Sequence, residues 1–138
     1  MRILKTKFIL LSLIGIVLGC HSGPKIEWQK FDEKIFQQAL QSDKPTILYL
    51  GARWCGSCTM LQATTFRDPR LMARLENWNR LHLDVSNQNE QTLRGQVQFK
   101  IYEIPTVVLY TPSGREFFRK TGRISSDELI QITERIIS

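Results

Sequence analysis

The chain has 138 residues, of which 42% are hydrophobic and 23% charged, a balance typical of one globular domain with its own core rather than of a disordered or repetitive protein. Its formal net charge is +6, and removal of the N-terminal segment that carries Arg2, Lys5 and Lys7 would leave +3. The remaining basic residues alternate with acidic ones. This pattern excludes the basic patch of a nucleic-acid-binding protein, and we expect no nucleic-acid partner.

Residues 1–19 have the layout of a secretory signal, with a basic start, an apolar run over residues 8–18 and a glycine before Cys20. The apolar run is shorter than the ~20 residues that cross a bilayer. The stretch Val17–Cys20 resembles the lipobox of bacterial lipoproteins, which implies that residues 1–19 are removed and that Cys20 carries the lipid. An uncleaved membrane anchor with an unmodified thiol is the alternative.

Both interpretations place the domain outside the cytoplasm, where disulfides persist. We expect a protein of the bacterial cell envelope that faces the periplasm and is held to a membrane by lipid on Cys20. His21 rather than aspartate follows that cysteine, and the sorting pattern implied by the lipobox resemblance then slightly favours the outer membrane, if one exists. Residues 20–27 form a short tether, and residues 28–138 form the domain.

The first elements of the domain are a helix and a buried strand. Apolar residues recur at helical spacing from Asp32, which can cap the helix, to Gln41. Lys44-Pro45 separates this helix from residues 46–50, nearly all apolar, which predict a central strand buried on both faces.

Two cysteines follow this strand at once. The motif Trp54-Cys55-Gly56-Ser57-Cys58 is followed by Met60, Leu61 and Ala63, which give a helix an apolar side. The two thiols are therefore predicted to lie three residues apart at a helix N-terminus.

Asp68-Pro69 predicts the start of another helix, which runs to about Glu76, with the carboxylate as cap and proline at the first position. The alternation over residues 81–85 predicts a strand that turns its leucines and valine inward, so that His82 points to the surface, and we assign this histidine no role. Between residues 87 and 100, a helix is predicted with Leu93 and Val97 on its apolar face.

Residues 106–110 and 115–120 flank a Pro-Ser-Gly turn and predict an antiparallel hairpin. Residues 125–128 resemble a capping box, and the isoleucines and leucine that follow form the apolar stripe of a closing helix. Strands separated by helices predict an α/β fold with a parallel part of the sheet, to which the hairpin adds an antiparallel part.

The position of the pair suits thiol chemistry because a helix N-terminus lowers a cysteine pKa from ~8.5 toward ~7 or below. Cys55, first in the pair, is the expected nucleophile, and attacks a partner disulfide. Cys58, one helical turn on and more buried, then attacks Cys55 and releases the reduced partner. Arg53 adds positive charge nearby.

Three other interpretations compete. A structural disulfide would not need this turn between a buried strand and a helix. A zinc site normally has four Cys or His ligands, and beyond the pair only His21 and His82 remain, so we expect no metal and no cofactor. A redox-inactive binding domain that merely keeps the motif stays open.

The motif at residues 54–58, Ile104-Pro105-Thr106 before an apolar strand and Gly122 after the hairpin resemble thioredoxin-like proteins over most of residues 30–137. The resemblance implies a thioredoxin fold, a central mixed β-sheet flanked by helices on both faces. It implies that Pro105 is cis and lies against the cysteines and that Ile104 offers its backbone to an extended partner segment. Trp54 then flanks the substrate-binding surface, which Gly56 and Ser57 complete.

Within the family, the run Thr65-Phe66-Arg67-Asp68-Pro69-Arg70-Leu71 resembles the C-terminal periplasmic domain of the DsbD electron transporter. This implies a reductant relay that takes electrons from a membrane donor and passes them to periplasmic partners, as in the maturation of cytochromes or envelope proteins. The relatives carry a buried acid six residues before the first cysteine, and DsbD another seven residues after it. This chain has Tyr49 and Gln62 there.

The leading hypothesis is an extracytoplasmic, monomeric thiol:disulfide oxidoreductase that reduces disulfides of partner proteins through Cys55 and Cys58. The second is a non-catalytic adaptor or maturation factor that holds a partner in the groove around Trp54 and Pro105. The missing acids favour the adaptor, and the motif in its strand-to-helix setting favours the enzyme.

Overall fold

The computed structural model describes residues 23–137, so the signal segment and Cys20 lie outside the described residues. The strands are β1 (Gln29–Lys30), β2 (Thr46–Gly51), β3 (Asn79–Asp84), β4 (Thr106–Tyr110) and β5 (Glu116–Thr121). The helices are α1 (Glu33–Leu40), α2 (Gly56–Ala63), α3 (Pro69–Arg74), α4 (Glu90–Phe99) and α5 (Ser126–Ile137), with the 3-10 turn η1 (Thr65–Arg67) after α2. The predicted order of elements is confirmed, with the addition of β1 and η1.

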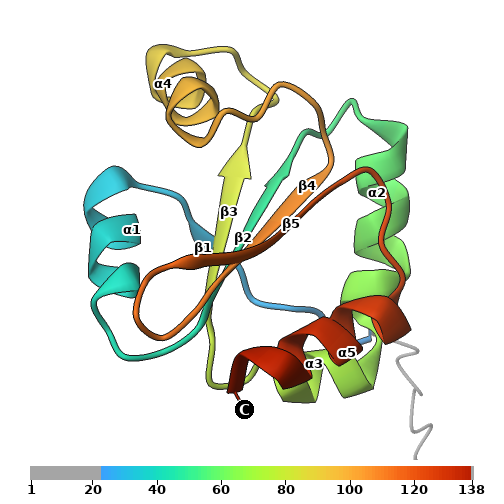
Figure 1. Cartoon of the computed structure of the whole chain (residues 1–138). Helices are drawn as coiled ribbons and strands as arrows, with labels where there is room; N and C mark the ends of the chain where they lie inside the picture. The colour runs from blue at the N-terminus through green and yellow to red at the C-terminus, as the bar shows by residue number, and fades with distance from the viewer. Residues whose placement is uncertain (1–22, 138) are drawn as a thin grey trace, which may run out of the picture.

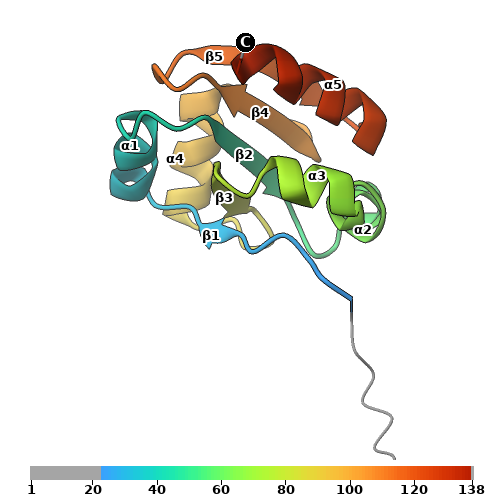
Figure 2. The ribbon, with the colours of Figure 1, turned by 90° about the horizontal axis from the view of Figure 1, so that it is seen from below.

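The strands form one five-stranded sheet in the order β1-β3-β2-β4-β5. β1, β3 and β2 run parallel, whereas β4 is antiparallel to both β2 and β5. Helices α1 and α4 lie on one side of this sheet, and α2, α3 and α5 lie on the other (Figures 1 and 2). The expected mixed sheet with helices on both faces is therefore confirmed.

The core consists of two layers separated by the sheet. Every residue of β2 is buried, as predicted for a central strand. Leu48 and Leu50 belong to the layer that also holds both cysteines, whereas Ile47 and Tyr49 pack in the layer of α2, α3 and α5. Because side chains alternate along a strand, this single segment joins both halves of the core.

The predicted caps explain where two helices begin. The carboxylate of Asp32 accepts hydrogen bonds from the backbone N–H groups of Lys34 and Ile35 at 2.9 and 3.2 Å. Asp68 accepts one from the N–H of Arg70 at 2.9 Å, with proline at the first turn. Side-chain acceptors thus satisfy donors that a helix N-terminus leaves free.

The predicted apolar face of α4 is wrong. Leu93 and Val97 are 47% and 66% exposed, and the helix instead buries Thr92, Gly95 and Phe99. A Cβ at Gly95 would lie 2.7 Å from Cδ2 of Leu83, so the helix packs on β3 through its small side. Close approach, rather than the hydrophobic period, decides how this helix is rotated.

Packing also starts earlier than expected. Ile26 is only 5% exposed, and a guanidinium nitrogen of Arg67 donates to the carbonyl of Gly23 at 2.8 Å. Gln29–Lys30 then pairs with β3, opposite Leu81 and His82. Within residues 23–137, no helix has the length and apolar character needed to span a bilayer.

Candidate active site

The two cysteines lie where β2 gives way to α2. Cys55 is the N-cap residue of α2, with extended backbone angles (φ −91°, ψ 109°). Its Sγ accepts a hydrogen bond from the backbone N–H of Cys58 at 3.2 Å, and its carbonyl accepts one from Thr59 at 3.1 Å. The sulfur of Cys55 thus occupies the position of a capping acceptor at the positive end of a helix dipole.

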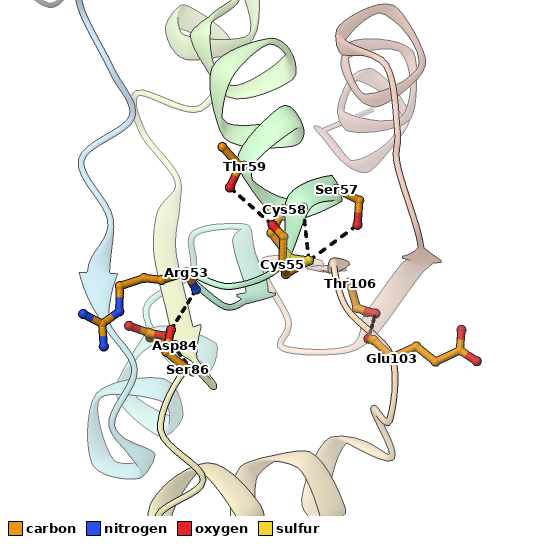
Figure 3. Close-up of a disulfide and its surroundings, with 9 residues drawn as sticks. All are labelled: Arg53, Cys55, Ser57, Cys58, Thr59, Asp84, Ser86, Glu103 and Thr106. Atoms are coloured by element: carbon orange, nitrogen blue, oxygen red, sulfur yellow. Dashed lines mark hydrogen bonds between the residues drawn. A yellow bond between two sulfur atoms is a disulfide. The ribbon is translucent and has the colours of Figure 1, made fainter.

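Cys55 and Cys58 form a disulfide, with their Cα atoms 5.2 Å apart (Figure 3). Cys55 is 8% exposed and Cys58 2%. The first cysteine is therefore the more accessible, in the order that the sequence predicts for attack and release.

The two residues between the cysteines, Gly56 and Ser57, have small side chains. The hydroxyl of Ser57 lies 3.5 Å from Sγ of Cys55, and a Cβ added at Gly56 would meet nothing within 4 Å. The backbone N–H of Arg53 donates to the Ser86 hydroxyl at 2.8 Å. The guanidinium of Arg53 points away from the sulfurs (Figure 3), so its charge acts on them only weakly.

Trp54 lies on the surface next to the pair. Its side chain is 64% exposed, although its indole nitrogen donates to the carbonyl of Ser86 at 3.2 Å. An exposed aromatic ring held by one hydrogen bond offers apolar area to a partner at little entropic cost.

The chain leading into β4 also passes near the disulfide, where Figure 3 shows Glu103 before the strand and Thr106 at its start. The Ile104–Pro105 peptide bond is cis, which confirms the expectation drawn from the resemblance. Gly122, at φ +85°, donates its N–H to the carbonyl of Pro105 at 2.8 Å. In the described part of the chain, we find no hydrogen bond to the backbone of Ile104.

A cavity of about 290 Å³ extends behind Cys58. It is lined by Ala52, Arg53, Cys58, Thr59, Gln62, His82 and Asp84. Two elements far apart in sequence, the start of α2 and the end of β3, thus line one pocket beside the less exposed sulfur.

His82 is half-buried, whereas the sequence predicts a surface residue. Its ring stacks on Tyr49 with centroids 4.7 Å apart and planes at 16°, and its Nε2 is closed off from solvent without a hydrogen-bond partner among the described residues. Burial lowers the pKa of His82, and the charge of Asp84 opposes that shift. The alternation of β3 does give the direction of the side chain, but the face it points to is covered as well.

Tyr49 and Gln62 stand where the relatives have acids. Tyr49 is fully buried; burial raises its pKa, and the nearby side chain of Gln62 opposes the shift. The hydroxyl nevertheless lacks a hydrogen bond of good geometry within residues 23–137. Neither position supplies a carboxylate for the second cysteine.

The one carboxylate at this cavity belongs to Asp84. Burial would raise its pKa, but hydrogen bonds from the hydroxyl and backbone of Ser86, with His82 and Arg53 nearby, hold the pKa below its usual value. The Ser86 N–H donates to this carboxylate at 2.8 Å. Sequence reasoning missed both Asp84 and Ser86, although His82 and Asp84, two residues apart, share one face of a strand.

A metal centre is not indicated: residues 23–137 contain no group of three or more His, Cys, Asp or Glu side chains placed to hold an ion. The alternative of a zinc site therefore gains no support from the described residues.

The family model of the thioredoxin-like domain matches residues 33–137 of the sequence. The thiol:disulfide interchange protein DsbD of Campylobacter jejuni (strain RM1221) is 30% identical over 102 residues, which cover 74% of this chain and 18% of that protein. DsbD 1 of Pseudomonas aeruginosa is 26% identical over 129 residues, which cover 86% and 22%. The chain thus spans about a fifth of the length of these relatives.

Solved structures show the same fold. The oxidised C-terminal domain of Neisseria meningitidis DsbD has a TM-score of 0.63 at 21% identity and covers 76% of this chain and 96% of that domain. A thioredoxin from Thermus thermophilus has a TM-score of 0.67 at 14% identity, with 81% and 88% covered. At such identities the likeness is one of fold.

Proposed function

This chain belongs to the thioredoxin-like family, and from that premise we propose that it is a thiol:disulfide oxidoreductase that reduces disulfides of partner proteins through Cys55 and Cys58. The observation that carries the proposal is the disulfide between these residues at the N-terminus of α2, with the first sulfur the more accessible. A purely structural bridge would need neither the capping position nor the exposed Trp54 beside it.

The reaction starts from the dithiol. The Cys55 thiolate attacks one sulfur of the partner disulfide, so that a mixed disulfide forms and the other partner sulfur leaves as a thiolate. Cys58 then attacks Sγ of Cys55, which restores the Cys55–Cys58 disulfide and releases the second partner thiolate. In total, two electrons pass to the partner. The backbone N–H of Cys58 lies 3.2 Å from Sγ of Cys55, and this hydrogen bond favours the Cys55 thiolate in the first step.

The partner binds across the surface on both sides of Cys55. Trp54, Gly56 and Ser57 border one side, and the Ile104–Pro105 segment borders the other. The absence of a hydrogen bond to the Ile104 backbone among the described residues supports pairing with an extended partner segment, because proline has no N–H and the Pro105 carbonyl is already taken by Gly122.

Similarity to DsbD favours the reductant direction, in which a membrane donor supplies the electrons. It also supports a domain that faces the periplasm. Because this chain covers about a fifth of DsbD, both the donor and the substrates are proposals.

Reduction of insulin disulfides tests the activity. We expect the wild-type chain to accelerate insulin reduction by a small dithiol and Cys55→Ala to leave the rate at background. Equal rates for the two proteins would end the enzyme proposal. The equilibrium with glutathione gives the reduction potential of the Cys55–Cys58 disulfide and so tests the direction of exchange. A potential well above ~−180 mV is typical of disulfide-forming or isomerising proteins rather than of reductants.

The membrane attachment is a separate proposal that rests on the Val17–Cys20 stretch. Labelled palmitate should be incorporated into the wild-type chain and not into Cys20→Ser. Fractionation of the envelope then tests the preference for the outer membrane, and absence of label in the wild type would refute lipidation.

The adaptor remains a second candidate because Tyr49 and Gln62 offer Cys58 no carboxylate. An adaptor would bind partners through the surface around Trp54 and Pro105 without a covalent step. It predicts that partner binding survives the loss of Cys55.

A further inference from the structure

We propose that His82 takes the proton of Cys58 when this cysteine resolves the mixed disulfide, across the cavity that both residues line. The inference rests on the thiol:disulfide exchange proposed above and assigns the proton acceptor for its second step. In the reverse direction, the same imidazole returns a proton to Cys58 when an electron donor opens the disulfide.

The step needs an acceptor because Cys58 is 2% exposed. A thiol must lose its proton before it attacks a disulfide. Cys58 lines the pocket of about 290 Å³, and a side chain that accepts its proton has to line the same pocket. One water molecule needs only ~15 Å³ of such volume, so there is room for a short water bridge.

The chemistry of the lining residues leaves one acceptor. Besides Cys58, the titratable residues at the cavity are Arg53, His82 and Asp84. A guanidinium cannot accept a proton. Asp84 already accepts hydrogen bonds from the side chain and the N–H of Ser86, and its lowered pKa makes it a weak base near neutral pH.

His82 has the properties of a proton acceptor. Burial lowers its pKa, so the imidazole is neutral at pH 7 and has a lone pair to accept with. Its buried Nε2 lacks a hydrogen-bond partner among the described residues, so no such bond fixes the tautomer. The ring stacks on Tyr49, and no hydrogen bond among the described residues competes for Nε2.

The other elements packed on His82 add no competing base. Tyr49 of β2 stacks on the ring, and burial raises its pKa, so it stays protonated at neutral pH. Trp28 lies 6.4 Å from the ring between centroids and does not titrate. Lys30 of β1 is opposite His82 in the strand register, and Asp84 provides the one charge that shifts the histidine pKa.

The Cys58 thiol gives its proton, through water in the cavity, to Nδ1 of the neutral His82 imidazole, since Nε2 is closed off from solvent. The resulting thiolate attacks Sγ of Cys55; the Cys55–Cys58 bond forms, and the bond between Cys55 and the partner breaks. The partner sulfur leaves as a thiolate, and the imidazolium then releases its proton to water.

Stopped-flow reaction of the reduced protein with an equimolar aromatic disulfide, dithiobis-nitrobenzoic acid, separates the two steps. The first coloured thiolate appears when Cys55 attacks, and the second when Cys58 resolves. General acid–base catalysis typically contributes ~10²-fold or more, so across water we expect His82→Gln to slow the second phase roughly 10- to 100-fold and to leave the first unchanged. In the wild type, the second phase should slow as the pH falls through the His82 pKa, and the variant should lose this dependence.

Trp28→Phe is the matched control, since it alters packing against the same ring without removing the titrating group. It should retain the pH profile of the second phase. An unchanged second phase in folded His82→Gln would overturn the inference, whereas loss of the first phase in the wild type would overturn the proposed function instead.

A measurement on the wild type avoids the risk that His82→Gln fails to fold. The Cε1–H signal of His82 can be titrated by NMR in the reduced protein. Its pKa should match the pH at which the second phase declines. A clear mismatch between the two values would also contradict the inference.

Discussion

The two sulfurs of one disulfide face very different surroundings. Cys55 opens toward a surface made by the exposed Trp54, the uncrowded Gly56 and the segment at Pro105. Cys58, three residues later, is only 2% exposed and lines a pocket whose other wall comes from β3. We call the surface around Cys55 the open side; it is built from residues next to the motif and a turn before β4. We call the surroundings of Cys58 the closed side; they depend on how β3 packs behind α2.

This difference divides the exchange reaction into two problems. The open side must admit a partner and stabilise one thiolate. The closed side must move a proton to and from a sulfur that solvent barely reaches. We therefore expect substitutions on the open side to change partner binding and those on the closed side to change resolution or stability.

The largest effect should come from removing either sulfur. With the aromatic disulfide, Cys55→Ala should lose both coloured phases, because Cys58 is too buried to attack first. Cys58→Ala should keep the first phase and lose the second. A rapid first phase in Cys55→Ala would show that the assigned order of the cysteines is wrong.

A matched pair of glycines tests the packing of the two sides. A Cβ at Gly51 would lie 2.1 Å from the hydroxyl of Tyr49, a ring held between His82 and Phe66, so Gly51→Ala should overpack the core and cost about 1–3 kcal/mol of unfolding free energy. Gly56→Ala should cost far less, because nothing lies within 4 Å of its Cβ. Denaturant unfolding measures both.

The double variant Tyr49→Phe/Gly51→Ala identifies the clash. Removal of the hydroxyl takes away the atom nearest to the added methyl, so the double variant should regain part of the stability. If it is no more stable than Gly51→Ala, the hydroxyl is not the source of the cost.

Trp54→Ala tests the open side. Loss of a ring that is 64% exposed should raise KM for a protein disulfide, by roughly fivefold or more if the ring is a binding hot spot. The rate with a small aromatic disulfide should stay nearly constant. Val97→Ala, which truncates another exposed apolar side chain, is the control and should change neither value.

The smallest effect is the pH dependence of stability. The pKa of His82 lies below its ordinary value of 6.5 in the folded chain, so below pH 6.5 the unfolded chain binds the proton more readily. The unfolding free energy should therefore fall as the pH decreases from 6.5 toward the folded-state pKa. His82→Gln should flatten this region, and an equal slope in both proteins would contradict the burial of a neutral histidine.

The open side could be predicted from the sequence because its features are local or belong to the family pattern. The position of Cys55 follows from an apolar strand, two cysteines and a helix close together in the chain. The cis bond at Pro105 followed from the resemblance alone.

The closed side could not be predicted because it depends on tertiary packing. The alternation of side chains along a strand gives the face of the sheet to which His82 points. It does not say whether other elements cover that face. In the same way, Leu93 and Val97 suggested the wrong face of α4, because Gly95 allows closer packing on Leu83 than any larger residue would. Both errors concern side chains whose surroundings come from a distant part of the chain.

Covalent capture of partner proteins tests the central claim most directly. Tagged Cys58→Ala should accumulate partner proteins in mixed disulfides that a reductant releases, while Cys55→Ala should accumulate none, because only the accessible sulfur attacks. Covalent capture by the first variant alone is the predicted result. If both variants capture partners equally, and these complexes survive washing under native conditions but do not depend on a reductant-sensitive bond, the result would contradict exchange and identify a noncovalent adaptor.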